Sequence, residues 1–253
     1  MAEKFELRTK HQFTALMERR DRWDRIRNEP EARARFEDLA GPEWARHNLG
    51  LEASSSDALW QAETPEASRL VQLQSHIAAA QRLFSLAKQK QFLSTDDLLE
   101  LHRVLCSGLH PSAGEFRQRE ATPLAQEHQT TEPELIAPLI DNALTWFQSE
   151  SFAEMHEVEK SALMLIKLLD IQPFEECNGS SLRLFSTFAM LKAGYPPAVI
   201  PAGKANEYAH AVQRSLRFDT QPIVDVIAAA TDWSLRWCLG EPPAPPMLKV
   251  LPS

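Results

Sequence analysis

The chain has 253 residues, of which 43% are hydrophobic and 25% charged, and this composition predicts a folded protein with a substantial core. Its formal net charge of −8 argues against a nucleic-acid partner. No run of about 18 apolar residues occurs, so we expect no membrane-spanning segment. The first residues form no apolar signal region and the three cysteines are scattered, so we expect a cytoplasmic location.

Alanine and leucine are abundant, glycines number only eight, and alternating strand-like runs are nearly absent, so the chain is predicted to be all-α. We divide it into an N-terminal helical extension (1–64), a core domain (65–240) and a proline-rich tail (241–253). Within residues 8–40 the apolar residues recur at helical spacing, and we expect one helix that breaks near Pro30 and a shorter one after it. The many Arg, Asp and Glu residues among these apolar positions indicate a solvated helix face with internal ion pairs.

Further along the chain, capping residues and prolines mark the expected helices. Residues 65–89 form a long amphipathic pattern, and Ser94 followed by acidic residues predicts a second helix start. A third helix is expected to begin at Pro133, or at Pro138, and to run to about Phe147. Two more helices are expected after the central one. They span 206–218 and 222–237.

The most informative stretch is 171–183, which joins two apolar helical runs. Pro173 is expected to stop the incoming helix, and Asn178 or Ser180 to cap the outgoing one. Gly179 is expected to adopt a φ that other residues avoid. The unpaired N–H groups of the helix start, with Arg183 one turn later, then predict an anion site. An ordinary capped helix with a solvated glutamate pair is the alternative interpretation.

At this point the residues resemble the signature loop of Fic (Fido) domains, His-Pro-Phe-x-Asp/Glu-Gly-Asn-Gly-Arg-x-x-Arg. Six positions match it: Pro173, Phe174, Glu176, Asn178, Gly179 and Arg183. The resemblance extends over roughly residues 48–238, including the Gly-x-x-Arg step 114–117. It implies a Fic-like helical bundle with a short β-hairpin or loop flap at 109–132. It also implies ATP and Mg²⁺ as ligands, with Glu176 at the metal position.

Three positions depart from the Fic pattern. Gln172 stands where the family has its catalytic histidine, and a carboxamide has no lone pair that accepts a proton near neutral pH. Ser180 replaces the first arginine, so the planar, charged phosphate clamp is missing. Cys177 replaces the first glycine and adds a side chain beside the expected phosphate. The anion-binding set implied by the resemblance is Cys177, Asn178, Gly179, Ser180, Arg183 and Tyr208.

Residues 48–54 resemble the inhibitory segment of many Fic proteins, in which a glutamate pairs with the second signature arginine. Glu52 stands at that position, and an ion pair between Glu52 and Arg183 is therefore a hypothesis. An ordinary surface glutamate is the alternative. In the resembling family the region of Tyr208 lies near the nucleotide, although a packing role for this tyrosine stays open.

Three functions follow from these residues. The first is a Fic-fold protein with an inactive or strongly impaired AMP transferase site that acts by binding a nucleotide, a phosphate group or a protein. The second is an active transferase that attaches AMP or another phosphate-containing group to a protein hydroxyl. It would use a substitute base, such as His110, His128 or a flap carboxylate. The third is a helical interaction module without a ligand. A protein target held by the 109–132 flap, and assembly of the chain into a homo-oligomer, are expected partner modes.

Overall fold

The computed structural model describes the backbone of residues 2–53 and 66–241, and the side chains of 13–52 and 69–241. Within these ranges the chain is built from helices and loops without a strand, which confirms the all-α prediction. The N-terminal elements are α1 (Ala2–Ile26), α2 (Pro30–Asp38), the π-helical turn η1 (Leu39–Glu43) and α3 (Trp44–Ala53). They are followed by α4 (Glu66–Gln89), α5 (Thr95–Leu105), α6 (Pro133–Trp146), α7 (Glu150–Ala153) and α8 (Glu157–Ile171). The last are α9 (Asn178–Lys192), the 3-10 turn η3 (Ala202–Lys204), α10 (Ala205–Ser215) and α11 (Gln221–Leu239).

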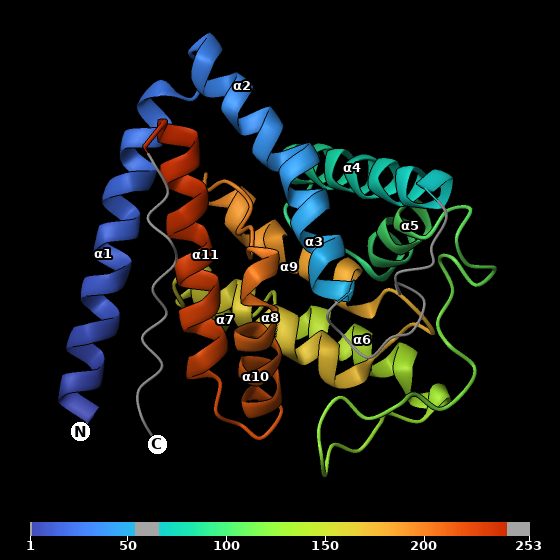
Figure 1. The fold of residues 1–253 in the computed structure, drawn as a ribbon. Helices are drawn as coiled ribbons and strands as arrows, with labels where there is room; N and C mark the ends of the chain where they lie inside the picture. Colours follow the sequence, from blue (N-terminus) through green and yellow to red (C-terminus); the bar gives the residue numbers. More distant parts are fainter. Residues whose placement is uncertain (1, 54–65, 242–253) are drawn as a thin grey trace.

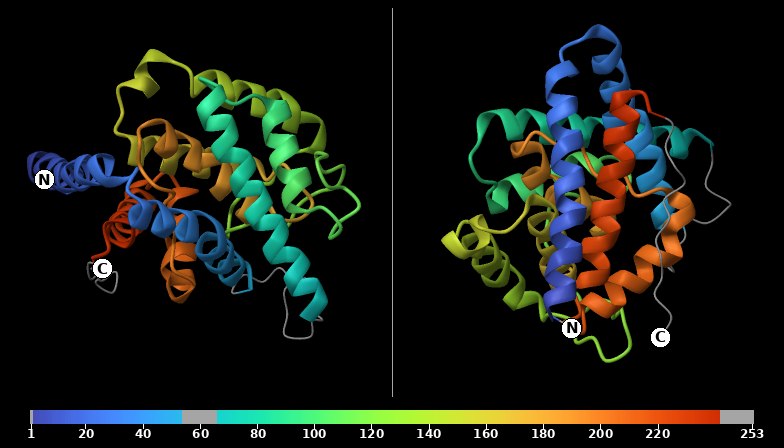
Figure 2. Two further views of the ribbon diagram at one scale, coloured as in Figure 1. Left: turned by 90° about the horizontal axis from the view of Figure 1, so that it is seen from above. Right: turned by 90° about the vertical axis from the view of Figure 1, so that its left-hand side faces the viewer.

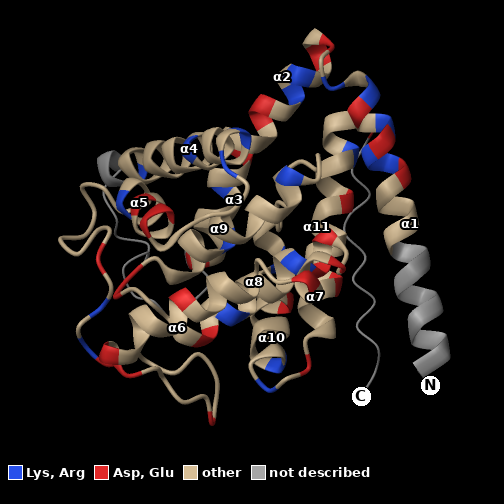
Figure 3. Cartoon of the chain, turned by 180° about the vertical axis from the view of Figure 1, so that it is seen from behind, with Lys and Arg blue, Asp and Glu red and all other residues tan. Residues whose placement is uncertain are grey.

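The N-terminal helices pack on the C-terminal part of the chain. Helix α1 runs beside α11 (Figures 1 and 2). Helix α2 follows α1 in the chain and leads toward α4. Basic and acidic residues are interspersed along α2 and the described part of α1, residues 13–26 (Figure 3). Several form short-range ion pairs, such as Arg33 with Glu37 at 2.8 Å. Arg19 instead pairs with Asp232 of α11. The charges of this region therefore form local ion pairs and also attach α1 to its neighbour.

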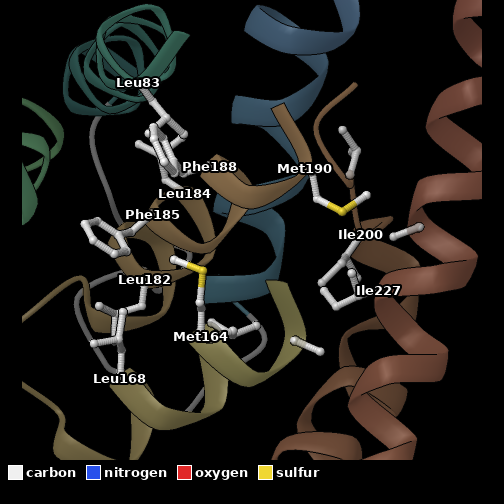
Figure 4. Close-up of a cluster of buried hydrophobic side chains, with 14 of the residues drawn as sticks. Leu83, Met164, Leu168, Leu182, Leu184, Phe185, Phe188, Met190, Ile200 and Ile227 are labelled. Carbon is white, nitrogen blue, oxygen red and sulfur yellow. The ribbon is translucent and has the colours of Figure 1, made fainter. Parts of the chain in front are cut away.

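Helix α9 is the centre of the molecule. It packs against α8, α4, α5 and α3, and its apolar side chains join the core (Figure 4). Phe185 and Phe188 lie on one side of the helix, whereas Met190 points to the other side, toward Ile200 and Ile227. Because α9 is buried on nearly all sides, its polar residues must also find partners inside the protein.

The helix boundaries follow the signals of the sequence. Ser94 caps α5 in a capping box, in which Asp97 N–H donates to Ser94 Oγ (3.3 Å) and Ser94 N–H donates to Asp97 Oδ2 (2.8 Å). Helix α6 begins at Pro133, so the alternative start at Pro138 is wrong. Pro138 lies inside α6 and removes only one main-chain donor near the helix start. The predicted start of α4 at 64–65 lies outside the described residues.

The segment predicted as a flap contains turns and no strand in this structure. Of the two predicted forms, hairpin or loop, it is the loop. No helix in the described ranges is both long enough and apolar enough to cross a lipid bilayer. The division of the chain at 64 and 240 stays a prediction, and the tail beyond Glu241 lies outside the described part of the chain.

Candidate functional site

Two residues with left-handed backbone conformations shape the loop between α8 and α9. They are Gln172, with φ of 48°, and Cys177, with φ of 58°. Helix α8 ends at Ile171, immediately before the first of them, as the sequence predicts. Cys177 is the N-cap residue of α9, and no side chain caps this helix. The prediction that Asn178 or Ser180 caps it is therefore wrong.

Asn178 closes the loop instead of capping the helix. Its Oδ1 accepts a hydrogen bond from the N–H of Phe174 (2.9 Å), and its Nδ2 donates to the carbonyl of the same residue (2.7 Å). Both polar atoms of the carboxamide are thus used by one peptide segment, and none is left for the helix start. Phe174 is fully buried and stacks on His102, with ring centroids 3.7 Å apart.

Gly179 is needed for space rather than for its φ. It has ordinary helical geometry, so the prediction of a special φ is wrong. A Cβ at this position would lie 2.5 Å from Glu52 Oε1 and 2.8 Å from Arg183 Nη1. Any side chain here would push the glutamate and the arginine away from the start of α9.

Glu52 and Arg183 form a buried ion pair that joins α3 to α9, as the resemblance suggests. Their side chains are 5% and 8% exposed. Arg183 also donates to Asn48 Oδ1 and to the Tyr208 hydroxyl (3.3 Å), and its guanidinium lies 5.3 Å from the centroid of the tyrosine ring. Burial alone lowers the pKa of Arg183, but Tyr208 and Glu52 outweigh burial and raise it, so the arginine stays charged.

Ser180 belongs to the same network. Its hydroxyl donates to Glu52 Oε1 (3.0 Å) and lies 3.3 Å from Nε2 of the buried His76. His76 Nδ1 contacts the carbonyl of Gln72 (2.8 Å), which only accepts, so Nδ1 carries the proton of the neutral ring. Burial lowers the pKa of His76 to about 4. Where the Fic pattern has an arginine, this chain has a hydroxyl between a carboxylate and a neutral imidazole.

Gln172 is buried beneath the loop that corresponds to the flap. Its Nε2 donates to the carbonyl of Thr122 (3.1 Å), and its Oε1 is buried without a partner among the described residues. The proposed substitute bases have other contacts. His110 lies 2.7 Å from the Ser112 hydroxyl, and His128 contacts Asp170 at 3.2 Å.

Arg117 ties this loop to the signature segment. Its Nε donates to the carbonyl of Gln172 (2.7 Å), and its other nitrogens donate to the carbonyls of Arg119 and Thr131. The side chain is almost completely buried, and burial lowers its pKa. Arg117 lies in the Gly-x-x-Arg step of the sequence, but only its long-range contacts reveal this positioning role.

Glu176 and Cys177 lie beside α5. The N–H of Gly114 donates to His102 Nδ1 (2.9 Å), so His102 carries its proton on Nε2 and donates it to the carbonyl of Glu176 (3.2 Å). The Cys177 thiol forms a hydrogen bond with Cys106. This bond, together with burial, raises the pKa of Cys177, which therefore remains a thiol. Among the residues that the structure describes, no three His, Cys, Asp or Glu side chains gather as a metal site.

Little free volume remains near the buried arginine. A cavity of ≈20 Å³ lies beside Asn48 and Arg183, which is room for about one water molecule. The structure therefore brings together Glu52, Ser180, Arg183 and Tyr208 from the predicted set. It adds Asn48, the first residue of the segment that resembles the inhibitory motif, and His76, which belongs to no motif.

Comparison with known proteins finds a Fic domain in the central part of the chain. A model of the Fic/DOC family matches residues 92–190. The protein adenylyltransferases Fic of Drosophila ananassae and Drosophila mojavensis are 34% and 33% identical to this chain over 148 residues, which is 58% of the chain. The match spans 29% of the length of each of these curated relatives.

Solved structures show the same fold. A structure of Fic-1 from Caenorhabditis elegans, residues 134–508, superposes with a TM-score of 0.80 and 21% identity. The superposition covers 94% of this chain and 73% of the other. A Fic-domain signalling protein from Bacteroides thetaiotaomicron gives a TM-score of 0.72 and 17% identity, over 91% of this chain and 98% of the other. The loop at 172–183, the buried Arg183 and these matches agree, and the chain contains a Fic/Fido domain.

Proposed function

We propose that this protein is a Fic-fold protein in which AMP transfer is absent or strongly impaired, and that it acts by binding a nucleotide, a phosphate group or a protein. The observation that carries the proposal is the carboxamide of Gln172 at the position of the catalytic base. This side chain donates to the Thr122 carbonyl and so holds the overlying loop. It has no group that could take a proton from an attacking hydroxyl.

The size of the deficit supports the proposal. Loss of a general base costs about 10²–10⁴ in rate. Loss of one preorganised donor at the developing charge costs about another 10²–10³. Ser180 offers one neutral hydroxyl in place of a guanidinium, and this hydroxyl already donates to Glu52. Transfer would be slower than in a complete Fic site by the combined factor.

Glu52 adds a block to the deficit. Its carboxylate contacts Arg183 where a phosphate of the nucleotide would bind in the resembling family. A phosphate would have to displace this carboxylate before it could use the same guanidinium. We propose that the resting protein is closed to nucleotide by its own α3.

The residues fit ATP and Mg²⁺ in part. The Nδ2 of Asn48, beside Arg183, is a buried donor without a partner in the described part of the chain, and Gly179 leaves space that a Cβ would fill. With Glu52 displaced, Arg183, Ser180 and Asn48 would hold phosphate oxygens, and Glu176 would bind the cation. ATP would supply the adenylyl group, and Mg²⁺ would neutralise charge on its phosphates.

The relatives are named protein adenylyltransferases, so a protein partner belongs to the proposal. We propose that residues 109–132 contact it, because this segment lies directly over Gln172 through Thr122 and Arg117. Homo-oligomer formation and a cytoplasmic location stay predictions.

Incubation with labelled ATP and Mg²⁺ tests the proposal. We expect no self-labelling of the wild type or of Glu52→Ala. The triple variant Glu52→Ala/Gln172→His/Ser180→Arg opens the site and supplies the base and the phosphate-binding arginine of the Fic pattern. It should label itself with AMP at least about 10²-fold faster than the wild type. The matched control is Glu52→Ala/Gln172→Asn/Ser180→Arg, because the shorter carboxamide of Asn supplies no base.

Robust labelling by the wild type would reject the proposal and favour a substitute base. A thermal-shift titration with ATP and Mg²⁺ then separates binding from chemistry, since a ligand of the folded state raises the unfolding midpoint. A raised midpoint in Glu52→Ala, larger than in the wild type, supports a nucleotide binder closed by Glu52. No shift in either protein assigns the chain to the ligand-free interaction modules.

A further inference from the structure

A second, much larger cavity lies on the opposite side of α9 from Arg183. Its volume is ≈530 Å³, within the range of about 300–1,000 Å³ that is usual for small-molecule sites. The residues of α9 that line it are Phe185, Phe188, Ala189 and Lys192. At 100° per residue these positions face away from Arg183, so this cavity is separate from the site described above.

The walls of this α9 cavity are apolar and aromatic. Phe147 at the end of α6 and Phe152 of α7 lie with ring centroids 5.2 Å apart, and Met164 of α8 completes the floor with the two phenylalanines of α9. Figure 4 shows Met164, Phe185 and Phe188 within the core. At the turn between α4 and α5, Phe92 remains 47% exposed although it lines the cavity. Water in such a space is readily displaced by an apolar group.

The polar groups of the α9 cavity carry a net positive charge. Lys160 and Lys192 line it together with one acid, Glu157. The Lys160 side chain is 14% exposed, and its Nζ lies 3.0 Å from Glu157 Oε2, whereas Lys192 Nζ donates to the carbonyl of Ala87 at 3.3 Å. Each ammonium has three donors, so both lysines retain capacity for an added anion. One excess positive charge matches one negative charge on a ligand.

We propose that the α9 cavity binds an amphipathic monocarboxylate, with its apolar chain among the phenylalanines and its carboxylate at Lys160 and Lys192. The apolar walls select the chain, and the two ammonium groups select an anionic head over a neutral or cationic one. The proposal is independent of AMP transfer, because none of the cavity residues belongs to the signature loop.

A titration of the full chain with dodecanoate, below its micelle concentration, tests the proposal. Methionine methyl groups labelled with ¹³C report on position: Met164 lines the cavity, whereas Met190 lies on the other side of α9 (Figure 4). We expect a saturable shift of the Met164 methyl signal with little change at Met190. Dodecyltrimethylammonium should bind at least about fivefold more weakly, because its head is repelled by both lysines. No saturable shift at Met164, equal shifts at both methionines, or equal affinity for the cationic amphiphile would each overturn the proposal.

Variants separate the head from the chain. Lys192→Met should weaken dodecanoate binding about two- to fivefold, while Lys88→Met, an exposed lysine outside the cavity, should leave it unchanged. Ala189→Trp should fill the cavity and abolish binding. If that variant does not fold, Ala153→Trp, on the exposed wall of α7, makes the same test. Undiminished binding in a folded cavity-filling variant would contradict the proposed position.

Discussion

The two sides of α9, one facing the signature loop and one facing the α9 cavity, differ in how much unfilled volume they border. On the signature side, Ser180 and Arg183 are enclosed by Glu52, His76 and Tyr208, and ≈20 Å³ of cavity remains. On the other side, ≈530 Å³ is left among phenylalanines. Buried polar groups cost free energy unless they are paired, so the chain fills the polar side with its own groups. Apolar walls carry no such requirement and can border an open cavity. The site that the sequence motif predicts is thus the one with almost no free volume.

The largest effect should come from removing the buried cation of the signature side. Arg183→Met should lower the free energy of unfolding by about 3–5 kcal/mol, because the Glu52 charge then stays buried without its counter-ion. Urea unfolding measures the loss. The double variant Arg183→Met/Glu52→Gln should recover most of it, and Arg33→Met, which breaks an exposed pair with Glu37, should cost only about 0.3–0.5 kcal/mol. A double variant as unstable as the single one would contradict this account.

Added volume should distinguish the two sides next. Gly179→Ala would normally stabilise a helix, but the new Cβ meets Glu52 Oε1, so we expect a loss of about 1–3 kcal/mol in thermal or urea unfolding. Ala189→Phe adds more atoms on the cavity side and should change stability by less than about 1 kcal/mol. In a Glu52→Ala background, Gly179→Ala should destabilise less, because only the contact with Arg183 Nη1 remains. If Ala189→Phe proves the costlier of the two substitutions, the contrast between the sides is wrong.

Acid should weaken the signature side through His76. Burial lowers the pKa of this histidine from 6.5 to about 4, so the unfolded chain takes up a proton at pH 5 that the folded protein excludes. Its contribution is fully present above pH 6.5, declines as the pH falls, and should be smaller by about 1–2 kcal/mol at pH 5. Urea unfolding of the wild type and His76→Gln at pH 7.5 and 5 measures the difference. The variant should lose less stability on acidification. The remaining loss includes contributions from His47 and His156, whose pKa values burial also lowers.

Local signals explain how much of the fold was predictable. Ser94, Pro30 and Pro173 act on neighbouring residues, so helix boundaries near them could be read from the chain. The start of α9 could not, because Asn178 and Ser180 prefer partners at Phe174 and Glu52 to the helix N–H groups. A cap prediction from residue type alone cannot weigh that competition.

The site was predictable only where a motif existed. The resemblance pointed to Glu52 and Arg183, whose pairing the structure contains. His76 belongs to no motif, and Asn48 departs from the Ser or Thr of the inhibitory segment, so neither was predicted to contact the site. Both reach it from positions more than 100 residues away in the sequence. The α9 cavity was not foreseen, since its walls come from five separate segments and each reads as ordinary core.

Arg117 has a consequence for how this loop tolerates change. Its side chain binds the signature segment through the main-chain carbonyls of Gln172 and Ile171, and every amino acid supplies such an oxygen. Exchanging the side chain at Gln172 therefore leaves these hydrogen bonds from Arg117 in place. At this position the Arg117 contacts fix the main chain whatever the side chain is, so a bundle of this kind can keep its form while the residue at the catalytic position changes.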